Sequence, residues 1–222
     1  MKLVSSKYNI KIEFKENSIN NLILENKIYL RNIIDVFINI LKGEEGEFVL
    51  SKNNNILDIK NEIKLILNPF NLDFKDNKIL NRIYKDMEEI GNESKNIKET
   101  REILNNLIEY LEIIISEIDY PLNYEMDIDF KKIFKVFNLE IQLGDSFLEK
   151  ILDYITIYRD IFKVNIFIFL NLKTYLTKEE YIEFYNYICQ KKIFIFNIET
   201  NQNKERYKWE NTKIIDEDLC EI

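Results

Sequence analysis

Apolar and polar residues alternate near the start of the chain and then change to helical spacing. Residues 8–14 alternate between the two kinds, which predicts a half-buried strand. A short apolar run at 22–24 leads into an amphipathic segment at 27–42, whose apolar positions recur every three or four residues. The pattern therefore predicts a strand, a second strand and a helix that Gly43 ends as a left-handed cap, with a further strand at 48–50.

The middle of the chain is predicted to be helical from residue 61 onwards. Apolar positions at helical spacing predict helices over 79–90, 97–118 and 130–137, and Pro121 prevents the second from continuing into the third. The long helix has an apolar face and a polar stripe. The apolar face consists of Ile97, Leu104, Ile108, Leu111 and Ile115, and the polar stripe of Glu102, Asn105, Glu109, Glu112 and Ser116.

Strand character returns at 139–142, 164–171 and 192–198. Two capping boxes, Ser146 with Glu149 and Thr177 with Glu180, predict helices between these strands. Nearly continuous apolar strands separated by a helix are typical of a parallel sheet covered on both faces. The sequence thus predicts a discontinuous α/β head, residues 1–60 and 139–222, with a helical leg, residues 61–138, inserted into it.

Composition narrows the chemistry that is open to this chain. Of its 222 residues 46% are hydrophobic, which is ample for a packed core, and none is histidine. Imidazole bases and imidazole metal ligands are therefore excluded. Its two cysteines do not suggest a disulfide framework or a thiolate metal site. No apolar run approaches the about 20 residues that span a bilayer, and the first residues lack a signal peptide's apolar core, so we expect a cytoplasmic protein without a membrane partner.

The negative charge of the chain is local. The net charge is -8, and residues 71–130 alone carry fifteen acidic against seven basic residues, whereas the remainder is balanced. Residues 102–130 hold eight carboxylates and neither Lys nor Arg. Such a concentration of charge faces solvent, a hard cation or a basic partner.

The two halves of this acidic stretch differ. The carboxylates up to residue 112 lie on the polar stripe of the long helix, where solvent is the expected environment. The remaining carboxylates lie on an irregular backbone around Pro121, where they can converge on Ca²⁺, which prefers about six to eight oxygen ligands. They lack the glycine and the distal glutamate of an EF-hand loop. The candidate metal ligands are Glu117, Asp119, Glu125, Asp127 and Asp129.

A phosphate-binding loop is missing where a strand leads into a helix. The run at 22–24 is followed by residues 25–27, Glu-Asn-Lys, without the glycines or the Gly-Lys-Ser/Thr ending that such loops need. The strand at 164–171 ends in Asn171, where a nucleotide hydrolase would keep a magnesium-binding Asp. We therefore expect no ATP hydrolysis.

Basic residues occur in two small groups, each of which is a candidate phosphate contact or ordinary solvated surface. The first group is Lys131, Lys132 and Lys135, and the second is Lys204, Arg206 and Lys208, interleaved with Tyr207 and Trp209.

Six stretches of the chain, in order, resemble one known family. They lie at 22–25, 71–93, 123–141, 167–180, 194–199 and 215–218, and the most telling is Leu-Thr-Lys-Glu-Glu at 176–180 between two apolar strands. Together they resemble the small CRISPR-associated protein of type II-A systems that takes part in acquiring new spacers. The resemblance covers nearly the whole chain.

The resemblance implies a fold and a function. The fold is an α/β head, related to P-loop ATPases but without a working nucleotide site, plus a helical leg. Members form a homotetrameric ring that binds the ends of double-stranded DNA through a positively charged central hole. Calcium ions near the junction of head and leg favour the ring, acting structurally. The partners are the spacer integrase complex and the guide-RNA effector nuclease, and the protein is not itself an enzyme.

For individual residues the resemblance matches the acidic segment of the family with the candidate ligands above, and Glu125 and Asp127 match best. Lys131, Lys132 and Lys135 are the candidate DNA contacts. Asn138 stands where relatives often have glycine, which indicates a left-handed helix end.

Two other functions stay open. Acidic clusters also hold the metal ions of nucleases, so the same carboxylates would suit a metal-dependent nuclease. The acidic face would equally suit a protein–protein adaptor that does not bind DNA.

Overall fold

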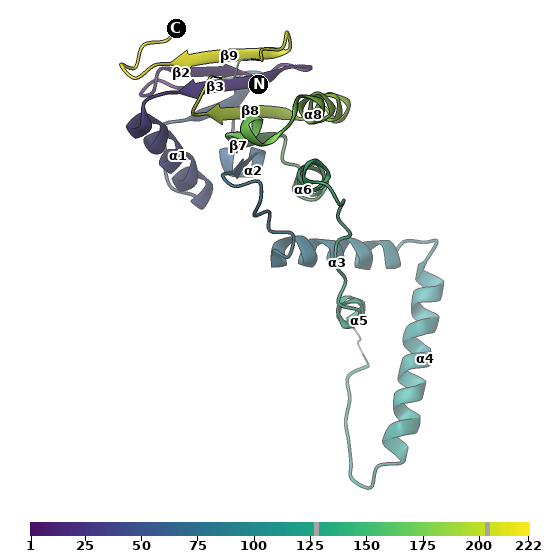
Figure 1. Cartoon of the computed structure of the whole chain (residues 1–222). Helices are drawn as coiled ribbons and strands as arrows, with labels where there is room; N and C mark the ends of the chain where they lie inside the picture. Colours follow the sequence, from purple (N-terminus) through teal and green to yellow (C-terminus); the bar gives the residue numbers. More distant parts are fainter. Residues whose placement is uncertain (127–128, 203–204) are drawn as a thin grey trace. The chain divides into compact units, whose positions relative to one another are not determined.

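The chain forms two compact units. The structure, a computed structural model, describes residues 1–126, 129–202 and 205–222. Unit 1 consists of Met1–Leu72 with Leu143–Ile222, and unit 2 consists of Asp73–Gln142 (Figure 1). Unit 2 is therefore inserted into the sequence of unit 1. It begins twelve residues after the start of the predicted leg, residues 61–138, and ends four residues after its end.

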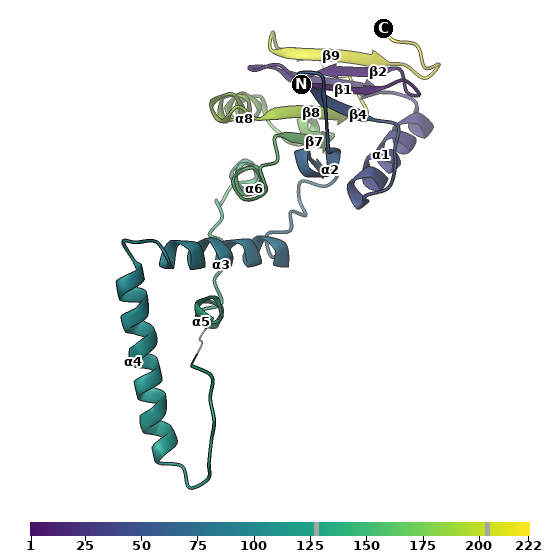
Figure 2. The same cartoon turned by 180° about the vertical axis from the view of Figure 1, so that it is seen from behind.

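Unit 1 is built on two β-sheets (Figures 1 and 2). Five parallel strands form the large sheet, which confirms the predicted α/β class. Its strands, in spatial order, are β6 (Ile63–Ile66), β7 (Ile166–Leu170), β8 (Phe194–Glu199), β3 (Ile19–Leu24) and β9 (Glu210–Ile215). The small sheet is antiparallel, in the order β2 (Ile10–Glu13), β1 (Lys2–Ser5), β4 (Val49–Lys52) and β5 (Asn55–Leu57).

Apolar side chains cover both faces of the large sheet. On one face, Phe37 of α1 (Lys27–Lys42) stacks on Phe48 at 4.5 Å and meets Phe196 of β8 edge-on at 6.5 Å. The small sheet contributes to the same core. On the other face, Phe169 of β7 meets Phe184 of α8 (Lys178–Lys191) at 6.0 Å. Burial on both faces explains why the parallel strands are nearly continuous runs of apolar residues. The remaining helices of unit 1 are α2 (Ile59–Glu62), α6 (Phe147–Phe162) and α7 (Leu172–Tyr175).

The helix signals in the sequence are confirmed. Ser146 caps α6 and Thr177 caps α8, each in a complete capping box with the glutamate three residues later. Gly43 ends α1 with φ of 97°, and its N–H donates to the last turn. Only residues that tolerate a left-handed backbone suit this position.

One strand prediction and one helix prediction are wrong. Residues 139–142 form no strand, because they lie in unit 2, and no strand among the described residues of that unit offers the hydrogen bonds that define one. Residues 63–66, predicted to be helical, form β6 beside β7. A four-residue segment with three apolar positions, Ile-Lys-Leu-Ile, fits a buried strand or a helix equally well. The deciding partner, β7, follows about a hundred residues later.

Unit 2 contains α3 (Asn77–Gly91), α4 (Ile97–Ser116) and α5 (Phe130–Val136). The turn between α3 and α4 is closed by the Thr100 hydroxyl, which is buried and donates to the carbonyl of Gly91 at 2.8 Å. Asn138 follows α5 with φ of 47°, so the expected left-handed helix end is confirmed. In the described part of the chain no helix has the length and apolar character needed to cross a bilayer.

Candidate functional site

The turn from β3 into α1 is closed to phosphate. The Asn26 side chain accepts hydrogen bonds from the backbone N–H groups of Ile28 at 3.1 Å and Tyr29 at 3.0 Å, the amides that would otherwise face a phosphate. The Asn26 amide nitrogen donates to the carbonyl of Glu217 at 2.8 Å, so the C-terminal segment lies against the same turn. The helix N-terminus is thus satisfied by the chain itself.

Asn171, after β7, also has a structural role. Its backbone is left-handed, with φ of 55°. The side-chain amide oxygen of Asn171 accepts from the backbone N–H of Thr200 at 2.8 Å and from the Thr200 hydroxyl at 3.0 Å. A neutral side chain therefore ties the ends of β7 and β8 together at the position where nucleotide hydrolases hold magnesium.

The predicted metal ligands lie apart along unit 2. Glu117 caps the C-terminus of α4, and Asp119 and Glu125 are exposed beyond it. Asp129 accepts from the backbone N–H of Lys131 at 3.0 Å and so caps α5. Asp127 lies outside the described residues. Among the described side chains no three acidic or thiol groups gather where an ion could be held.

The predicted DNA contacts share the short helix α5. Lys132 and Lys135 are exposed and Lys131 is half-buried. Of the second basic group, Arg206 and Lys208 are exposed, and Lys204 lies outside the described residues.

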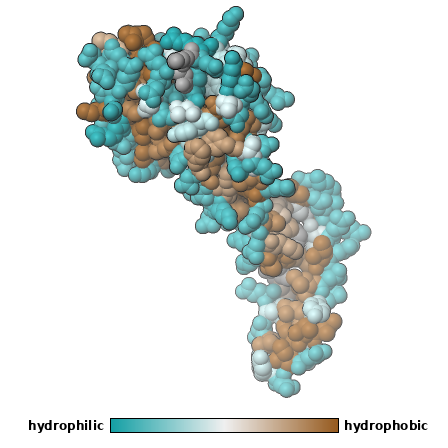
Figure 3. All heavy atoms as spheres, in the orientation of Figure 1, coloured by the Kyte–Doolittle hydropathy of each residue, from teal (hydrophilic) through white to brown (hydrophobic). Residues whose placement is uncertain are grey.

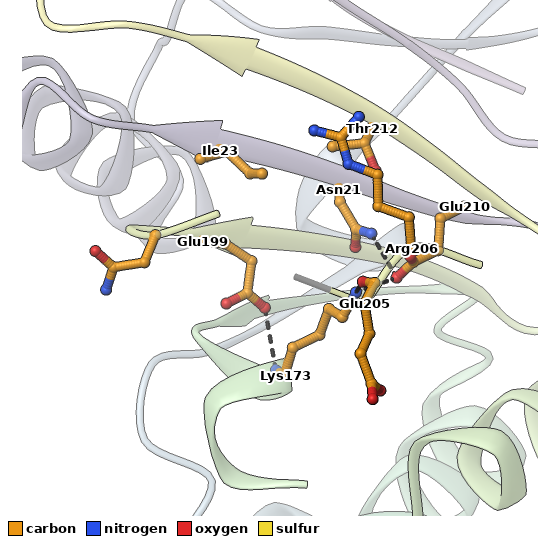
Figure 4. A pocket seen from close by; sticks show the side chains of 9 residues that line it. Asn21, Ile23, Lys173, Glu199, Glu205, Arg206, Glu210 and Thr212 are labelled. Carbon is orange, nitrogen blue, oxygen red and sulfur yellow. Dashed lines mark hydrogen bonds and ion pairs between the residues drawn. The ribbon is translucent and has the colours of Figure 1, made fainter. Parts of the chain in front are cut away.

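A buried cluster of charges in unit 1 was not predicted as a site (Figure 4). It joins Glu199 at the end of β8, Glu210 at the start of β9 and Lys173 of α7. The Lys173 ammonium lies 2.7 Å from the Glu210 carboxylate, and these side chains are 10% and 2% exposed. The backbone N–H of Lys173 donates to Glu199 at 3.1 Å, and Glu199 is 2% exposed. Three formal charges are thus withdrawn from water on one face of the sheet.

Glu210 collects hydrogen bonds from four parts of unit 1. Besides Lys173, its carboxylate accepts from the Asn21 amide of β3 and the Tyr181 hydroxyl of α8, both at 2.8 Å, and from the backbone N–H of Tyr207 at 3.0 Å. A buried carboxylate needs such donors, because desolvation of the unpaired ion is costly. Glu210 is therefore a fully satisfied structural group.

Glu199 is satisfied less completely. Burial raises the pKa of its carboxyl to about 7, against the smaller opposing effects of the backbone N–H and the charge of Lys173. A cavity of about 20 Å³, room for one water molecule, adjoins it and is also lined by Asn21, Thr212 and Arg206. Glu199 therefore changes its charge near neutral pH.

The sequence contains one sign of this cluster, namely glutamates at the ends of strands. Glu199 ends the largely apolar strand β8, and Glu210 begins β9 at the edge of the same sheet. A carboxylate at such a position needs a buried partner. The sequence does not say which one, since Lys173 is one of many lysines.

The chain is similar to known CRISPR-associated proteins. The sequence profile of the family described as CRISPR-associated protein (Cas_Csn2) matches residues 40–219. The protein named CRISPR-associated protein Csn2 of Enterococcus faecalis is 27% identical over 147 residues, 63% of each chain. The Csn2 protein of Streptococcus agalactiae is 31% identical over 131 residues, 57% of this chain and 58% of that one. These alignments span less than two thirds of the relatives' own length.

Solved structures of ATP-binding cassettes superpose weakly on the chain. CbiO1 of Clostridium perfringens, part of the ABC transporter complex CbiONQ, covers 87% of this chain and 71% of its own at 14% identity, with a TM-score of 0.45. The ATP-binding cassette MJ0796 covers 87% and 79% at 13% identity, with a TM-score of 0.38. Since both scores lie below 0.5, the fold class is assigned from the strand topology described above and not from these superpositions.

Replacing Glu199 with Gln should remove a pH dependence of stability. The folded protein retains a proton between the ordinary pKa of 4.5 and about 7 that the unfolded chain releases, so wild-type stability falls as pH rises through this window. Glu199→Gln keeps an acceptor for Lys173. We expect it to unfold like the wild type near pH 4.5 and to be more stable above pH 7, by on the order of 3 kcal/mol.

Urea unfolding from pH 4.5 to 8 measures this difference. Glu183→Gln, an exposed substitution on α8, is the matched control and should follow the wild type throughout. A constant difference between Glu199→Gln and the wild type at every pH would contradict the assignment.

Proposed function

Because the chain belongs to the Csn2 family of CRISPR-associated proteins, we propose that it acts in CRISPR adaptation as a non-catalytic protein that binds the ends of double-stranded DNA. In this proposal a homotetrameric ring holds the duplex in the cytoplasm and works with the spacer integrase complex and the guide-RNA effector nuclease. The observation that carries the proposal is the family match over 40–219. The geometry supports it at three places.

The first support is the closed turn between β3 and α1. Asn26 satisfies the helix N-terminus, and the sequence provides no histidine base. A P-loop enzyme needs free backbone amides and a lysine around the phosphates. The α/β unit therefore suits binding and assembly better than nucleotide hydrolysis.

The second support is the positive charge on α5. Within the described residues no carboxylate lies within ion-pair distance of Lys131, Lys132 or Lys135, whereas Lys95 and Lys98 of the same unit pair with glutamates. Unpaired ammonium groups bind phosphate without first breaking an ion pair. Contacts to phosphate alone carry no base information, so binding would be independent of sequence and sensitive to salt.

The third support is an uncovered apolar stripe on α4. Ile103, Leu107, Tyr110 and Ile114 follow one another at intervals of four and three residues and are 41–62% exposed. Figure 3 shows hydrophobic side chains, in brown, on the surface of unit 2. Spacing of this kind forms the seam between packed helices. A second copy of the chain would cover the stripe in a ring, and water would be excluded from it.

The acidic segment has the oxygen ligands that calcium prefers, but its described carboxylates do not lie together around one point. Carboxylate oxygens suit the ion. Among the described residues, however, the candidate ligands do not converge, and Asp129 is engaged as a helix cap. Calcium dependence therefore stays a prediction, and no step of the proposed DNA binding passes through the ion.

Reversing the charge of α5 should weaken DNA binding. For Lys132→Glu, Lys135→Glu we expect roughly tenfold or weaker binding of linear duplex and a salt dependence reduced by about 1.8 in log–log slope, which is two phosphate contacts. Lys95→Glu, Lys98→Glu changes the same charge in the same unit and should bind nearly as the wild type. Fluorescence anisotropy at several salt concentrations measures both, and equal affinities of the two variants would remove α5 from the interface.

Placing a charge in the apolar stripe of α4 should prevent assembly. Leu107→Glu would bury a carboxylate between packed helices, so we expect the assembled species to be lost at concentrations where the wild type is tetrameric. Asn105→Glu adds the same charge on the polar stripe of α4 and should leave assembly intact. Light scattering gives the masses. A tetramer of Leu107→Glu would show that α4 is not an interface.

Calcium should bind through the irregular half of the acidic segment. We expect Glu125→Ala, Asp127→Ala to lose calcium binding measured by calorimetry, and Glu102→Ala, Glu109→Ala on α4 to keep it, because the latter carboxylates belong to a solvated stripe. If the protein bound duplex DNA equally well with calcium and with a chelator, DNA binding would not depend on calcium.

A further inference from the structure

Residues 119–126 have the pattern of a strand but form none. Every even position from 120 to 126 is apolar or aromatic, and the odd positions from 119 to 125 hold Asp, Pro, Asn and Glu. Strict alternation over eight residues predicts a half-buried strand. In the structure the segment is irregular and lies between α4 and α5 (Figures 1 and 2), and no backbone hydrogen bond joins it to another described residue. The segment therefore lacks the partner strand that its pattern requires.

The apolar side chains of this segment are exposed. Tyr120 is 64% exposed, Leu122 42% and Met126 69%. Tyr124 is half-buried, and its hydroxyl donates to the Glu112 carboxylate. A contiguous row of exposed apolar side chains marks a surface that a partner covers. A strand would place this row on one face and the acidic side chains on the other.

Pro121 determines which edge of the segment can pair. Proline has no backbone N–H, so in a sheet it is confined to edge strands, with its missing donor directed away from the neighbouring strand. The backbone groups of successive residues in a strand point to opposite edges. The backbone groups at the even positions would therefore face the neighbouring strand, and those at the odd positions would face solvent.

Strand β5, at the edge of the small sheet, has free backbone groups. Residues 53–54 are left-handed, with φ of 51° and 64°, and form the two-residue turn between β4 and β5. The residues beside such a turn, Lys52 and Asn55, exchange backbone hydrogen bonds. The next pair, Ser51 and Ile56, does not, so the N–H and C=O of Ile56 point away from β4. No described strand lies on that side of β5.

The two faces of this edge match the two faces of the segment. Ile56, 78% exposed, and Val49, 48% exposed, lie on the outer face of the small sheet. Lys52 lies on the opposite face, and Lys60 follows β5 in α2; both are exposed, and neither forms an ion pair with a described carboxylate. In an antiparallel pair, the residue opposite Ile56 also directs its backbone groups inward. It is therefore an even, apolar residue, and its acidic neighbours lie on the face of Lys52.

We propose that residues 119–126 of one copy add to β5 of a second copy as an antiparallel strand. The position of Pro121, the apolar face and the charges each favour the same arrangement. The strand supplies a contact of the assembly, so this inference rests on the proposed function. Such a contact is head-to-tail and closes into a ring when the rotation between copies allows it. No hydrogen bond of the pairing requires calcium.

Hydrogen exchange at single amides tests the pairing in the whole chain. At concentrations where light scattering shows assembly, the amides of Ile56, Leu122 and Tyr124 should exchange at least about tenfold more slowly than after dilution to single copies. The amide of Asn123, on the same edge as Pro121, should exchange at the same rate in both states.

Two proline variants provide a matched comparison. Leu122→Pro removes an N–H that faces β5, whereas Asn123→Pro removes one that faces solvent. Both positions lie on irregular backbone without a backbone hydrogen bond, so neither variant breaks a helix or a strand of the single copy. Leu122→Pro should abolish the concentration-dependent protection of the Ile56 amide, and Asn123→Pro should retain it.

The outcomes separate this inference from the proposed function. Protection that is independent of concentration would show that the segment pairs within its own copy, and equal protection of Ile56 in both variants would show that the segment does not pair with β5; either result overturns the inference. Assembly without protection also overturns it, while duplex binding still tests the proposed function. Concentration-dependent protection in a protein that does not bind duplex DNA supports the strand pairing and refutes the proposed function. A protein that remains a single copy at every concentration refutes both.

Discussion

The carboxylate of Glu210 holds together the segments around β9, the edge strand of the parallel sheet. It accepts from β3, from α7, from α8 and from the backbone before β9, so four segments converge on one side chain that is almost completely buried. Removing any one of these donors would leave part of a buried charge unpaired. The same convergence orients Tyr181 and Tyr207 and holds Lys173, so the shape of the adjacent cavity follows from the stabilisation of this ion.

The neighbouring Glu199 lacks a charged partner of its own because of that arrangement. Glu210 takes the only ammonium group of the cluster, and Glu199 is left with a single backbone N–H. Its proton is therefore retained near neutral pH. One ammonium between two buried carboxylates makes one of them a fixed structural ion and the other a titrating group.

The two units differ in how their apolar residues are covered. In unit 1, apolar strands are covered on both faces, and the turn that could bind phosphate is occupied by Asn26 and the C-terminal segment. In unit 2, apolar residues of α4 remain exposed beside a row of carboxylates. An exposed apolar stripe of this length on a helix indicates a partner surface. The apolar stripe of α4 is therefore the surface of unit 2 that the proposed assembly would cover.

The sequence alone determined the α/β class, the capped helices, the left-handed end at Gly43 and the loss of the phosphate loop, because each depends on residues close together in the chain. Only the tertiary structure decided that residues 63–66 are a strand, that 139–142 are not, and that β9 lies beside β3. It also decided the partner of Glu210, since Asn21 lies 189 positions away. Strand pairing and charge burial depend on neighbours distant in the sequence, and local periodicity does not contain them.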